Sequence, residues 1–496
     1  MNIWRISAMF ILLTVASVSA QSLKNTDNSS DYLVITASRF APDVQQYVQW
    51  RSAPAPTHPA LRSRIVPLED INREFGDSTR PQAQAEAIRS FVSYALQSWR
   101  KPAPRYVVLV GSTNIVPSYR IKVGIPLLQQ QPYINYEDSI PLDEWYVVNR
   151  HIADFNNRPQ AAIGRIPGRT SAEIQRVLRK IRTFEEQGNS LGYDSTLFTT
   201  LLDAQDVTMF DEATYLFFEF LRYRIPRPVS NRSLDYSKLL GRADAKTEVF
   251  RGINSGSPLV MYYGHGAPAQ WSRYSIVVTD DIGNRLARQN RPFILSTAGC
   301  SQNFDLPRTP SIVEAAMLLD SGGAVATVAS SGYSSLPENN FFQKFFYRFL
   351  LSSPGMDIGT AMLKAKTEAF EGGLAEQDTF ARRMTLLGDP ALVPFRRLIT
   401  SVADAPANNS QQAVLSDIAP NPASGQATIR IFLERSEALQ IDIVNLRGEQ
   451  LITRHLQGQR GENTFALDLT GFANGIYAYR VSGTSIIATK FFSVLR

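Results

Sequence analysis

Short apolar runs alternate with amphipathic segments from about residue 31 to about residue 395. Runs that are apolar without interruption are typical of strands covered on both faces of a sheet. We predict such strands at residues 32–36, 106–110, 161–164, 199–202, 258–263, 293–297 and 324–329. The segments between them carry apolar residues at helical spacing, which predicts amphipathic helices. This alternation predicts a mostly parallel α/β sheet flanked by helices, built as one unit or as two units side by side.

Two helix starts can be predicted from capping residues. Thr170 and Glu173 have the spacing of a capping box, in which each side chain accepts a hydrogen bond from the backbone of the other. Thr309 is expected as the N-cap of a helix over residues 309–319, with Pro310 at its first position.

The pattern changes after about residue 395. Residues 401–413 are polar and rich in Ala, Asn and Pro, which is typical of a linker. In residues 414–496, apolar and polar positions alternate in short segments separated by Gly, Asn or charged turns. Such segments predict antiparallel strands, so we expect a C-terminal antiparallel β-sandwich.

The first 20 residues have the order of a signal peptide. A short basic stretch ends at Arg5, an apolar stretch follows, and small residues precede Gln21. We expect cleavage after Ala20, so that the mature protein leaves the cytoplasm. No later stretch of the sequence has the roughly 18 apolar residues of a membrane-spanning helix, so no transmembrane helix is expected.

Charge and cysteine content narrow the function classes. The chain has 496 residues and a net charge of +6, but its Lys and Arg residues form no block of about five or six like charges. We therefore expect no nucleic-acid partner. Cys300 is the only cysteine, which in an exported chain indicates a free thiol or an intermolecular bridge. CxxC and HxxxH spacings are absent, so we expect no site of metal ligation.

Cys300 and His265 each follow a predicted strand. Cys300 comes just after the strand at 293–297, and His265 stands between two glycines after the strand at 258–263. Because the carboxyl ends of parallel strands meet at one edge of a sheet, we expect the imidazole and the thiol side by side. In that position His265 would lower the pKa of the thiol and carry a proton to a leaving amine. None of the other three histidines has such a setting, so this pair is favoured over a structural histidine and an inert buried cysteine.

The glycines on either side of His265 suggest a site that a substrate backbone can approach. Gly264 and Gly266 are expected at positive φ, where glycine lets the chain turn sharply. The N–H groups of Gly266 and Cys300 could together line an oxyanion hole for a tetrahedral intermediate.

The sequence YYGHG, followed farther along the chain by AGC, is similar to the gingipain-type cysteine peptidases, relatives of caspases and legumains. Three further segments, YVVLVGSTNIVP, AAIGRIPGRTSAEIQRVLRKI and LLGDPAL, extend the resemblance over about residues 31–398. It implies a caspase-like α/β fold in a peptidase domain at residues 21–400. The first subdomain is expected at about 31–190 and the catalytic subdomain at 195–398.

The resemblance implies peptide-bond hydrolysis, with Cys300 as the nucleophile and His265 as the general acid/base. In the family an acidic residue on an earlier strand end orients the histidine; here Asp206 is the first candidate and Asp203 the second, and either could instead be a turn residue. Tyr333 lies in a segment that resembles the family's pocket wall, where it could flank a substrate side chain or simply pack.

One position departs from the family pattern. Gly111 is followed by Ser112 where the family has Gly-Asp, so a carboxylate at this position, with any ion contact that it makes, is lost. The resemblance requires no cofactor and allows a structural calcium ion.

Residues 414–496 resemble the C-terminal sorting domain of type IX secretion cargo. The shared features, in chain order, are Pro420-Asn421-Pro422, the turn at 446–448 and the strand that begins Gly475-Ile476-Tyr477. The resemblance implies the type IX secretion machinery as a partner and a secreted or outer-membrane-attached product. An ordinary adhesive β-sandwich is the alternative.

These features predict a secreted cysteine endopeptidase that acts on proteins or peptides. One alternative is a transpeptidase or processing enzyme of the same fold that attaches or trims other secreted cargo. A second alternative is a catalytically silent surface protein that keeps the fold for binding. The presence of Cys300, His265 and both neighbouring glycines argues against the silent protein.

Overall fold

The computed structural model describes residues 22–76, 81–122, 139–148, 158–187, 196–224, 229–286, 291–302, 310–320, 322–352, 355–371, 383–395, 414–415, 418–420, 423–433, 435–445, 450–483 and 487–494. The predicted signal peptide and the predicted linker at 401–413 lie outside these residues.

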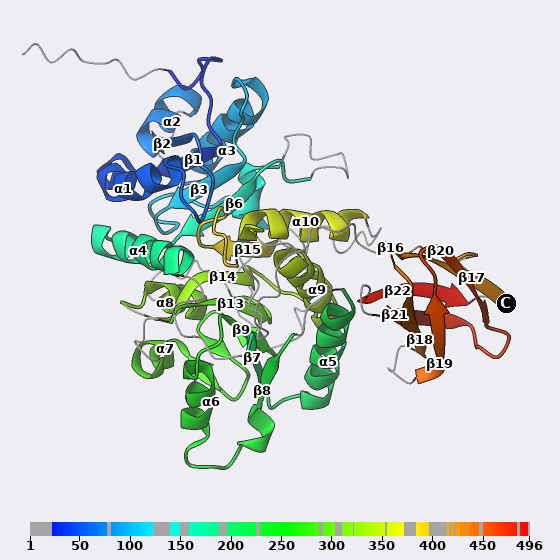
Figure 1. The fold of residues 1–496 in the computed structure, drawn as a ribbon. Helices are drawn as coiled ribbons and strands as arrows, with labels where there is room; N and C mark the ends of the chain where they lie inside the picture. The colour runs from blue at the N-terminus through cyan, green and yellow to red at the C-terminus, as the bar shows by residue number, and fades with distance from the viewer. Residues whose placement is uncertain are drawn as a thin grey trace, which may run out of the picture.

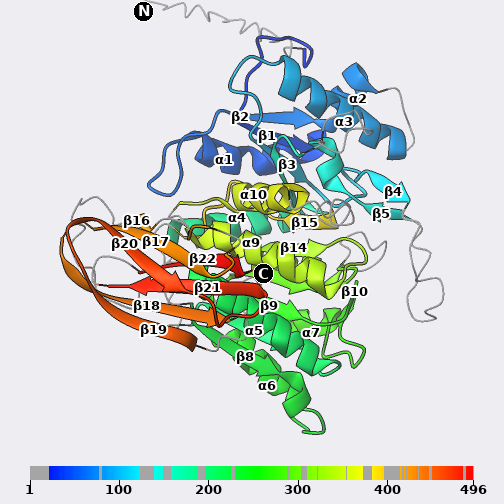
Figure 2. The same ribbon diagram turned by 90° about the vertical axis from the view of Figure 1, so that its right-hand side faces the viewer.

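A ten-stranded sheet forms the centre of the larger domain, which comprises the described residues between 22 and 395 (Figures 1 and 2). In spatial order its strands are β2 (Ser63–Pro67), β1 (Tyr32–Thr36), β3 (Tyr106–Val110), β6 (Ala162–Ile166), β15 (Met384–Leu387), β14 (Ala324–Ser330), β13 (Phe293–Ala298), β9 (Leu259–Tyr263), β7 (Phe198–Leu202) and β8 (Asn231–Asp235). β15 is parallel to β6 and antiparallel to β14, so the strands of the two halves point in opposite directions. The other neighbouring strands are parallel, and the predicted mostly parallel sheet is confirmed.

Each predicted strand of the larger domain is present, with ends shifted by at most two residues. β2, β8 and β15 are additional strands that the pattern did not predict. β2 and β8 form the two edges of the sheet and are only partly buried, so they lack the continuous apolar run of a central strand. β15 is fully buried but has only four residues.

Helices cover both faces of the sheet (Figures 1 and 2). They are α1 (Ala41–Ser52), α2 (Leu68–Phe75), α3 (Pro81–Ser98), α4 (Ser171–Gln187), α5 (Val207–Arg224), α6 (Ala245–Asn254), α7 (Thr279–Arg285), α8 (Ile312–Leu318), α9 (Leu336–Ser352) and α10 (Ile358–Glu371). Alternate residues of β1 enter two separate cores: Tyr32 and Val34 pack with residues of α1 and α4, whereas Leu33 and Ile35 pack with residues of α2 and α3. This two-sided burial explains why β1 and β3 are apolar over almost their whole length.

The capping box before α4 is confirmed. Glu173 N donates to Thr170 Oγ1 at 3.3 Å, and the Glu173 carboxylate accepts from Thr170 N at 3.3 Å. The predicted start of the next capped helix is wrong, because α8 begins at Ile312 with Ser311 as its N-cap. Ser311 Oγ accepts from Glu314 N, and the Glu314 carboxylate accepts from Ser311 N, so a complete capping box fixes the start two residues later than Thr309.

Shorter elements complete the larger domain. They are the strand pair β4 (Arg120–Lys122) and β5 (Ser139–Pro141), the three-stranded sheet of β10 (Gly266–Ala267), β11 (Gln270–Trp271) and β12 (Val277–Val278), and the 3₁₀ helices η1 (Ser38–Phe40), η2 (Asp143–Tyr146) and η4 (Tyr236–Lys238). Within the described part of the chain, no helix has the length and apolar character needed to cross a membrane.

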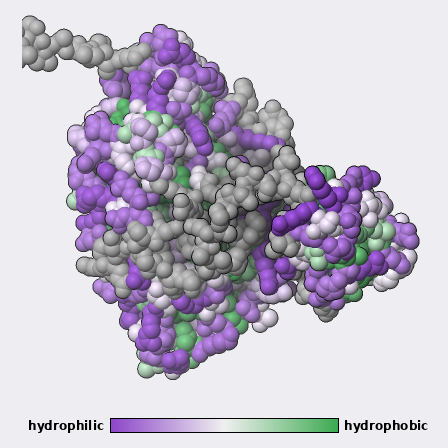
Figure 3. Space-filling view, viewed as in Figure 1, coloured by the Kyte–Doolittle hydropathy of each residue, from purple (hydrophilic) through white to green (hydrophobic). Residues whose placement is uncertain are grey.

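Two antiparallel sheets form the smaller C-terminal domain, beside α5 and α9 of the larger one (Figures 1 and 2). One contains β16 (Val414–Leu415), β17 (Gln426–Leu433) and β20 (Gly461–Asp468), and the other contains β19 (Gln450–Gly458), β18 (Glu437–Asn445), β21 (Gly475–Ser482) and β22 (Ile487–Val494). Every second residue of β17 is buried, which confirms the predicted β-sandwich pattern. On the face in Figure 3, hydrophilic residues cover most of the described surface of both domains.

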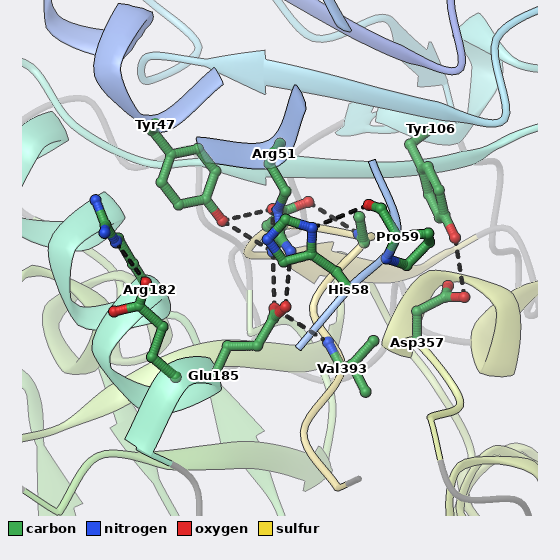
Figure 4. Close-up of polar contacts among 12 residues, drawn as sticks. Tyr47, Arg51, His58, Pro59, Tyr106, Arg182, Glu185, Asp357 and Val393 are labelled. Carbon is green, nitrogen blue, oxygen red and sulfur yellow. Dashed lines mark hydrogen bonds and ion pairs between the residues drawn. The ribbon is translucent and has the colours of Figure 1, made fainter. Parts of the chain in front are cut away.

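A buried ionic network joins α1, α4 and the turn after β15 (Figure 4). Arg51, on α1, donates two hydrogen bonds of 2.9 Å to the carboxylate of Glu185, on α4, and one of 2.8 Å to Asp389, just after β15. The three side chains are fully buried. Burial lowers the pKa of Arg51, but the charges of Asp389 and Glu185 raise it and hold that pKa well above its usual value. The guanidinium therefore stays charged inside the domain.

Candidate active site

The sheet register brings Cys300 and His265 to neighbouring strand ends. β9 and β13 are parallel, with Tyr263 opposite Ala298. His265 and Cys300 each lie two residues beyond this pair, and Gly264 N donates to Ala298 O at 3.2 Å. Strand pairing therefore places the loops that carry the imidazole and the thiol at the same edge of the sheet.

Asp206 contacts the imidazole ring. Its Oδ2 lies 3.1 Å from His265 Nε2, with the two side chains 52% and 33% exposed. Asp206 follows β7, the neighbour of β9, and its carbonyl accepts from Phe210 N to start α5. Its φ of +54° is in the left-handed region, which aspartate enters more readily than most residues. This backbone turn points the carboxylate at the ring instead of at the N-terminus of α5.

Asp203, the second candidate, holds the backbone of the histidine loop and not the ring. It is fully buried, and its Oδ2 accepts from His265 N at 3.0 Å. Its Oδ1 accepts from Ser272 Oγ and, at 3.2 Å, from Gln205 N. The sequence left the choice between the two aspartates open. In the structure, Asp206 contacts the imidazole ring, whereas Asp203 accepts a hydrogen bond from the backbone N–H of the histidine.

The Cys300 thiol is partly buried and donates a hydrogen bond of 2.9 Å to Ser334 O. Burial raises the pKa of this thiol, as does the charge of Glu338, whereas the hydrogen bonds of Ser334 lower it. We expected the neighbouring imidazole to lower this pKa, and that expectation is wrong for this structure because desolvation outweighs the other contributions. The thiol is therefore neutral near pH 7 in this arrangement.

The glycines serve a different purpose from the predicted one. Neither Gly264 nor Gly266 is among the residues with positive φ. Instead, both allow close packing: a Cβ on Gly266 would lie 2.5 Å from Gln302 Nε2 and 2.7 Å from Cys300 O, and one on Gly264 would lie 2.5 Å from Asp203 Cβ. Any larger residue would push the histidine loop away from the cysteine loop.

The backbones proposed for the oxyanion hole touch one another. A Cβ on Gly266 would lie 3.3 Å from Cys300 N. The chain then turns sharply at Ser301, whose φ is +52° and whose N–H donates to Gly332 O at 2.7 Å. The role of the two N–H groups in binding an oxyanion stays a prediction.

Tyr333 lies in the loop after β14 that lines the cysteine. Burial raises the pKa of its phenol, as do the nearby acidic groups of Cys300 and Glu338 when they are ionised, and Arg383 lowers it. Arg383 Nη1 donates to Tyr333 O at 2.8 Å, which fixes the loop against the start of β15. Tyr333 is thus near the thiol and partly exposed, as a pocket wall requires, and its contact with substrate stays a prediction.

Sequence reasoning missed Ser334 and Gln302. Ser334 acts on the thiol through its main-chain carbonyl, for which side-chain chemistry gives no signal. Gln302 is buried, and its amide bridges the cysteine and histidine loops; its position two residues after the cysteine is the one available signal.

A structural calcium ion stays a prediction. Within the described residues, no three or more His, Cys, Asp and Glu side chains are grouped so as to hold a metal ion. Ser112 stands where the family pattern has an aspartate. Its backbone carbonyl closes a turn by accepting from Ile115 N and Val116 N, at 2.9 and 3.0 Å. No described contact there supplies a carboxylate ligand.

A thiol and an imidazole on adjacent strand ends, with a carboxylate at the ring, are the side chains of a cysteine-type peptidase. Residues 25–395 match the model of peptidase family C25. The chain belongs to this family and is a cysteine-type peptidase.

Solved structures support the fold. The Arg-specific cysteine proteinase gingipain R is 16% identical, with a TM-score of 0.56 over 93% of this chain and 97% of that one. A complex of the Porphyromonas gingivalis RgpB pro- and mature domains is 17% identical, with a TM-score of 0.56 over 94% of this chain and 100% of that one. These neighbours confirm the caspase-like α/β fold. No curated protein sequence matches the chain.

The C-terminal β-sandwich matches a second family model. Residues 417–494 match the secretion system C-terminal sorting domain. The protein is therefore cargo of the type IX system, secreted or attached to the cell surface.

Proposed function

We propose that this protein is a secreted endopeptidase that hydrolyses peptide bonds through Cys300 and His265, with Asp206 orienting the ring. The observation that carries the proposal is the 3.1 Å contact between Asp206 and His265, at the strand end beside the one that bears Cys300. A carboxylate on Nε2 selects the tautomer in which Nε2 carries the proton, so Nδ1 is the nitrogen that exchanges protons.

The reaction that we propose has two halves. Cys300 Sγ attacks the scissile carbonyl carbon while its proton passes to His265, and the resulting oxyanion accepts hydrogen bonds from the N–H groups of Gly266 and Cys300. The C–N bond then breaks, and His265 gives the proton to the leaving amine. Water, deprotonated by His265, attacks the thioester, releasing the carboxylic acid and the thiol.

The resting thiol must leave Ser334 O before it reacts, since that carbonyl holds its proton. A substrate backbone arriving beside the loop at 331–335 would displace this contact. Tyr333 would then flank the side chain before the scissile bond, which is consistent with its place near Cys300.

Incubation with a peptide library tests the reaction class. We expect internal cleavage, read by mass spectrometry of the products, and a preference for the residue before the cut. Products in which an added amine-bearing peptide is joined to the acyl fragment would favour the transpeptidase alternative. Binding without any cleavage would favour the silent surface protein and contradict the proposal.

The Asp206→Asn variant is expected to lower kcat/KM by about 10- to 100-fold. This is less than the roughly 10⁴-fold loss for a buried triad aspartate, because Asp206 is half exposed and water can partly replace its contact with the ring. Asp211→Asn, at an exposed position of α5, the helix that follows Asp206, is the matched control and is expected to retain full activity. Equal activity of the two variants would remove Asp206 from the mechanism.

A further inference from the structure

Gly266 lies in β10, opposite Trp271 in β11. The residues next to this pair are His265 and Ser272. His265 O accepts from Ser272 N at 2.7 Å, so these two residues form a hydrogen-bonded pair. Because hydrogen-bonded and non-hydrogen-bonded pairs alternate along antiparallel strands, Gly266 is at a non-hydrogen-bonded position. Its N–H therefore points away from β11.

The direction of that N–H is set by the two donors that hold the carbonyl of the same peptide, one of which is a side chain. In a planar trans peptide the C=O and the next N–H point in opposite directions, so a group that holds His265 O also aims Gly266 N–H. Ser272 N does this from β11, and the Tyr262 hydroxyl does it from the sheet side, donating to His265 O at 2.6 Å while lying 3.4 Å from Asp203 Oδ2. The ring is fully buried and stacks on Trp271 at a centroid distance of 4.7 Å, so the hydroxyl is held rigidly.

The peptide before Cys300 is held in the same way from a different loop. Ser334 Oγ donates to Gly299 O at 3.2 Å, and this carbonyl shares its peptide plane with Cys300 N–H. Ser334 is buried, and its hydroxyl accepts from Asn339 Nδ2 at 2.9 Å, which leaves its proton for the carbonyl.

A third side chain, that of Gln302, sets the distance between the segment that carries Gly266 and the segment that carries Cys300. Gln302 Nε2 donates to Ala267 O at 3.1 Å and to Cys300 O at 3.2 Å, while its Oε1 accepts from Trp271 Nε1 at 2.9 Å. This buried amide is fully hydrogen-bonded and links the histidine loop to the cysteine loop.

We infer that the hydroxyls of Tyr262 and Ser334 are positioning groups for the oxyanion hole, aiming Gly266 N–H and Cys300 N–H from behind. The inference rests on the proposed function, because an oxyanion forms only if Cys300 attacks a carbonyl. Neither hydroxyl touches the substrate; each acts through a peptide unit. Donors fixed before the reaction need no reorganisation when charge develops, which is what makes an oxyanion hole effective.

The test compares Tyr262→Phe with Tyr263→Phe. Both tyrosines are fully buried on β9, but the hydroxyl of Tyr263 lies 3.5 Å from Asn340 Oδ1, away from the histidine loop. Tyr262→Phe is expected to lower kcat about 10-fold or more, short of the 10²- to 10³-fold cost of losing a donor outright, with KM changed less than about twofold. Tyr263→Phe is expected to leave both constants within about twofold of the wild type.

Two chemical probes separate oxyanion binding from general damage. A peptide aldehyde, to which the thiolate adds to form a thiohemiacetal, should lose affinity for Tyr262→Phe by the same factor as kcat. Alkylation of Cys300 by iodoacetamide displaces iodide without forming an oxyanion and should stay within about twofold. Ser334→Ala is expected to show the same split, so the test stands even if one variant fails to fold. Its control is Ser257→Ala, because Ser257 is also buried but its hydroxyl contacts Thr199 Oγ1 at 2.7 Å, before the start of β9.

Equal losses in kcat, aldehyde affinity and alkylation rate would overturn the inference, as would a Tyr262→Phe variant as active as Tyr263→Phe. A wild-type protein that neither cleaves peptides nor binds the aldehyde would contradict the proposed function itself.

Discussion

Replacing Cys300 with alanine is expected to lower peptide hydrolysis by about 10⁴- to 10⁶-fold, because nothing else in the site can form the covalent intermediate. The residual rate would reflect binding and the oxyanion hole alone. The measurement is kcat/KM on the best peptide from the library. The chain contains no second cysteine to take over the role.

The control for this variant is a measurement that shows that Cys300→Ala folds as the wild type does. Cys300 is partly buried and its side chain makes one hydrogen bond, so the thermal unfolding midpoint should stay within about 4 °C of the wild type. A folded Cys300→Ala protein that still cleaves the peptide at more than a few per cent of the wild-type rate would rule out this nucleophile.

Replacing Arg51 with methionine is expected to destabilise the larger domain by about 3–5 kcal/mol. The substitution leaves the carboxylates of Glu185 and Asp389 buried without their cation, and that uncompensated charge costs more than the lost attraction. The measurement is the free energy of unfolding from urea denaturation.

Arg182→Met is the matched control for this effect. Arg182 is on α4 with Glu185, but its ion pair with Glu186 is about 40% exposed on each side, so its loss should cost no more than about 1 kcal/mol. If the two variants unfold at the same urea concentration, the buried network does not stabilise the packing of α1 and α4 on the turn after β15.

The central strands were predictable because two-sided burial leaves an unmistakable pattern. β9 is apolar at every position and β13 begins with three apolar residues, since helices cover both faces of the sheet. β8 was not predictable: it lies at an edge, and its sequence Asn-Arg-Ser-Leu-Asp resembles a loop. The antiparallel insertion of β15 between the two halves is a long-range pairing, which no local pattern encodes.

In the candidate site, too, some residues could be predicted from the sequence and others could not. Cys300 and His265 were predictable because each stands just after an apolar strand. The choice of Asp206 over Asp203 was not, since it depends on a positive φ at Asp206 and on burial of Asp203 beneath the histidine loop. The hydrogen bond from the thiol to Ser334 O could not be predicted from the sequence either, because it involves a main-chain atom of a loop that is distant along the chain.

The most direct test of the central claim is labelling by a covalent, thiol-directed peptide probe. We predict that the wild type is labelled at Cys300, that Cys300→Ala is not labelled, and that His265→Ala is labelled at least about 10²-fold more slowly. Burial raises the pKa of the thiol, and His265 is the base that we propose removes its proton. Labelling at an unchanged rate in His265→Ala would contradict the activation of Cys300 by His265.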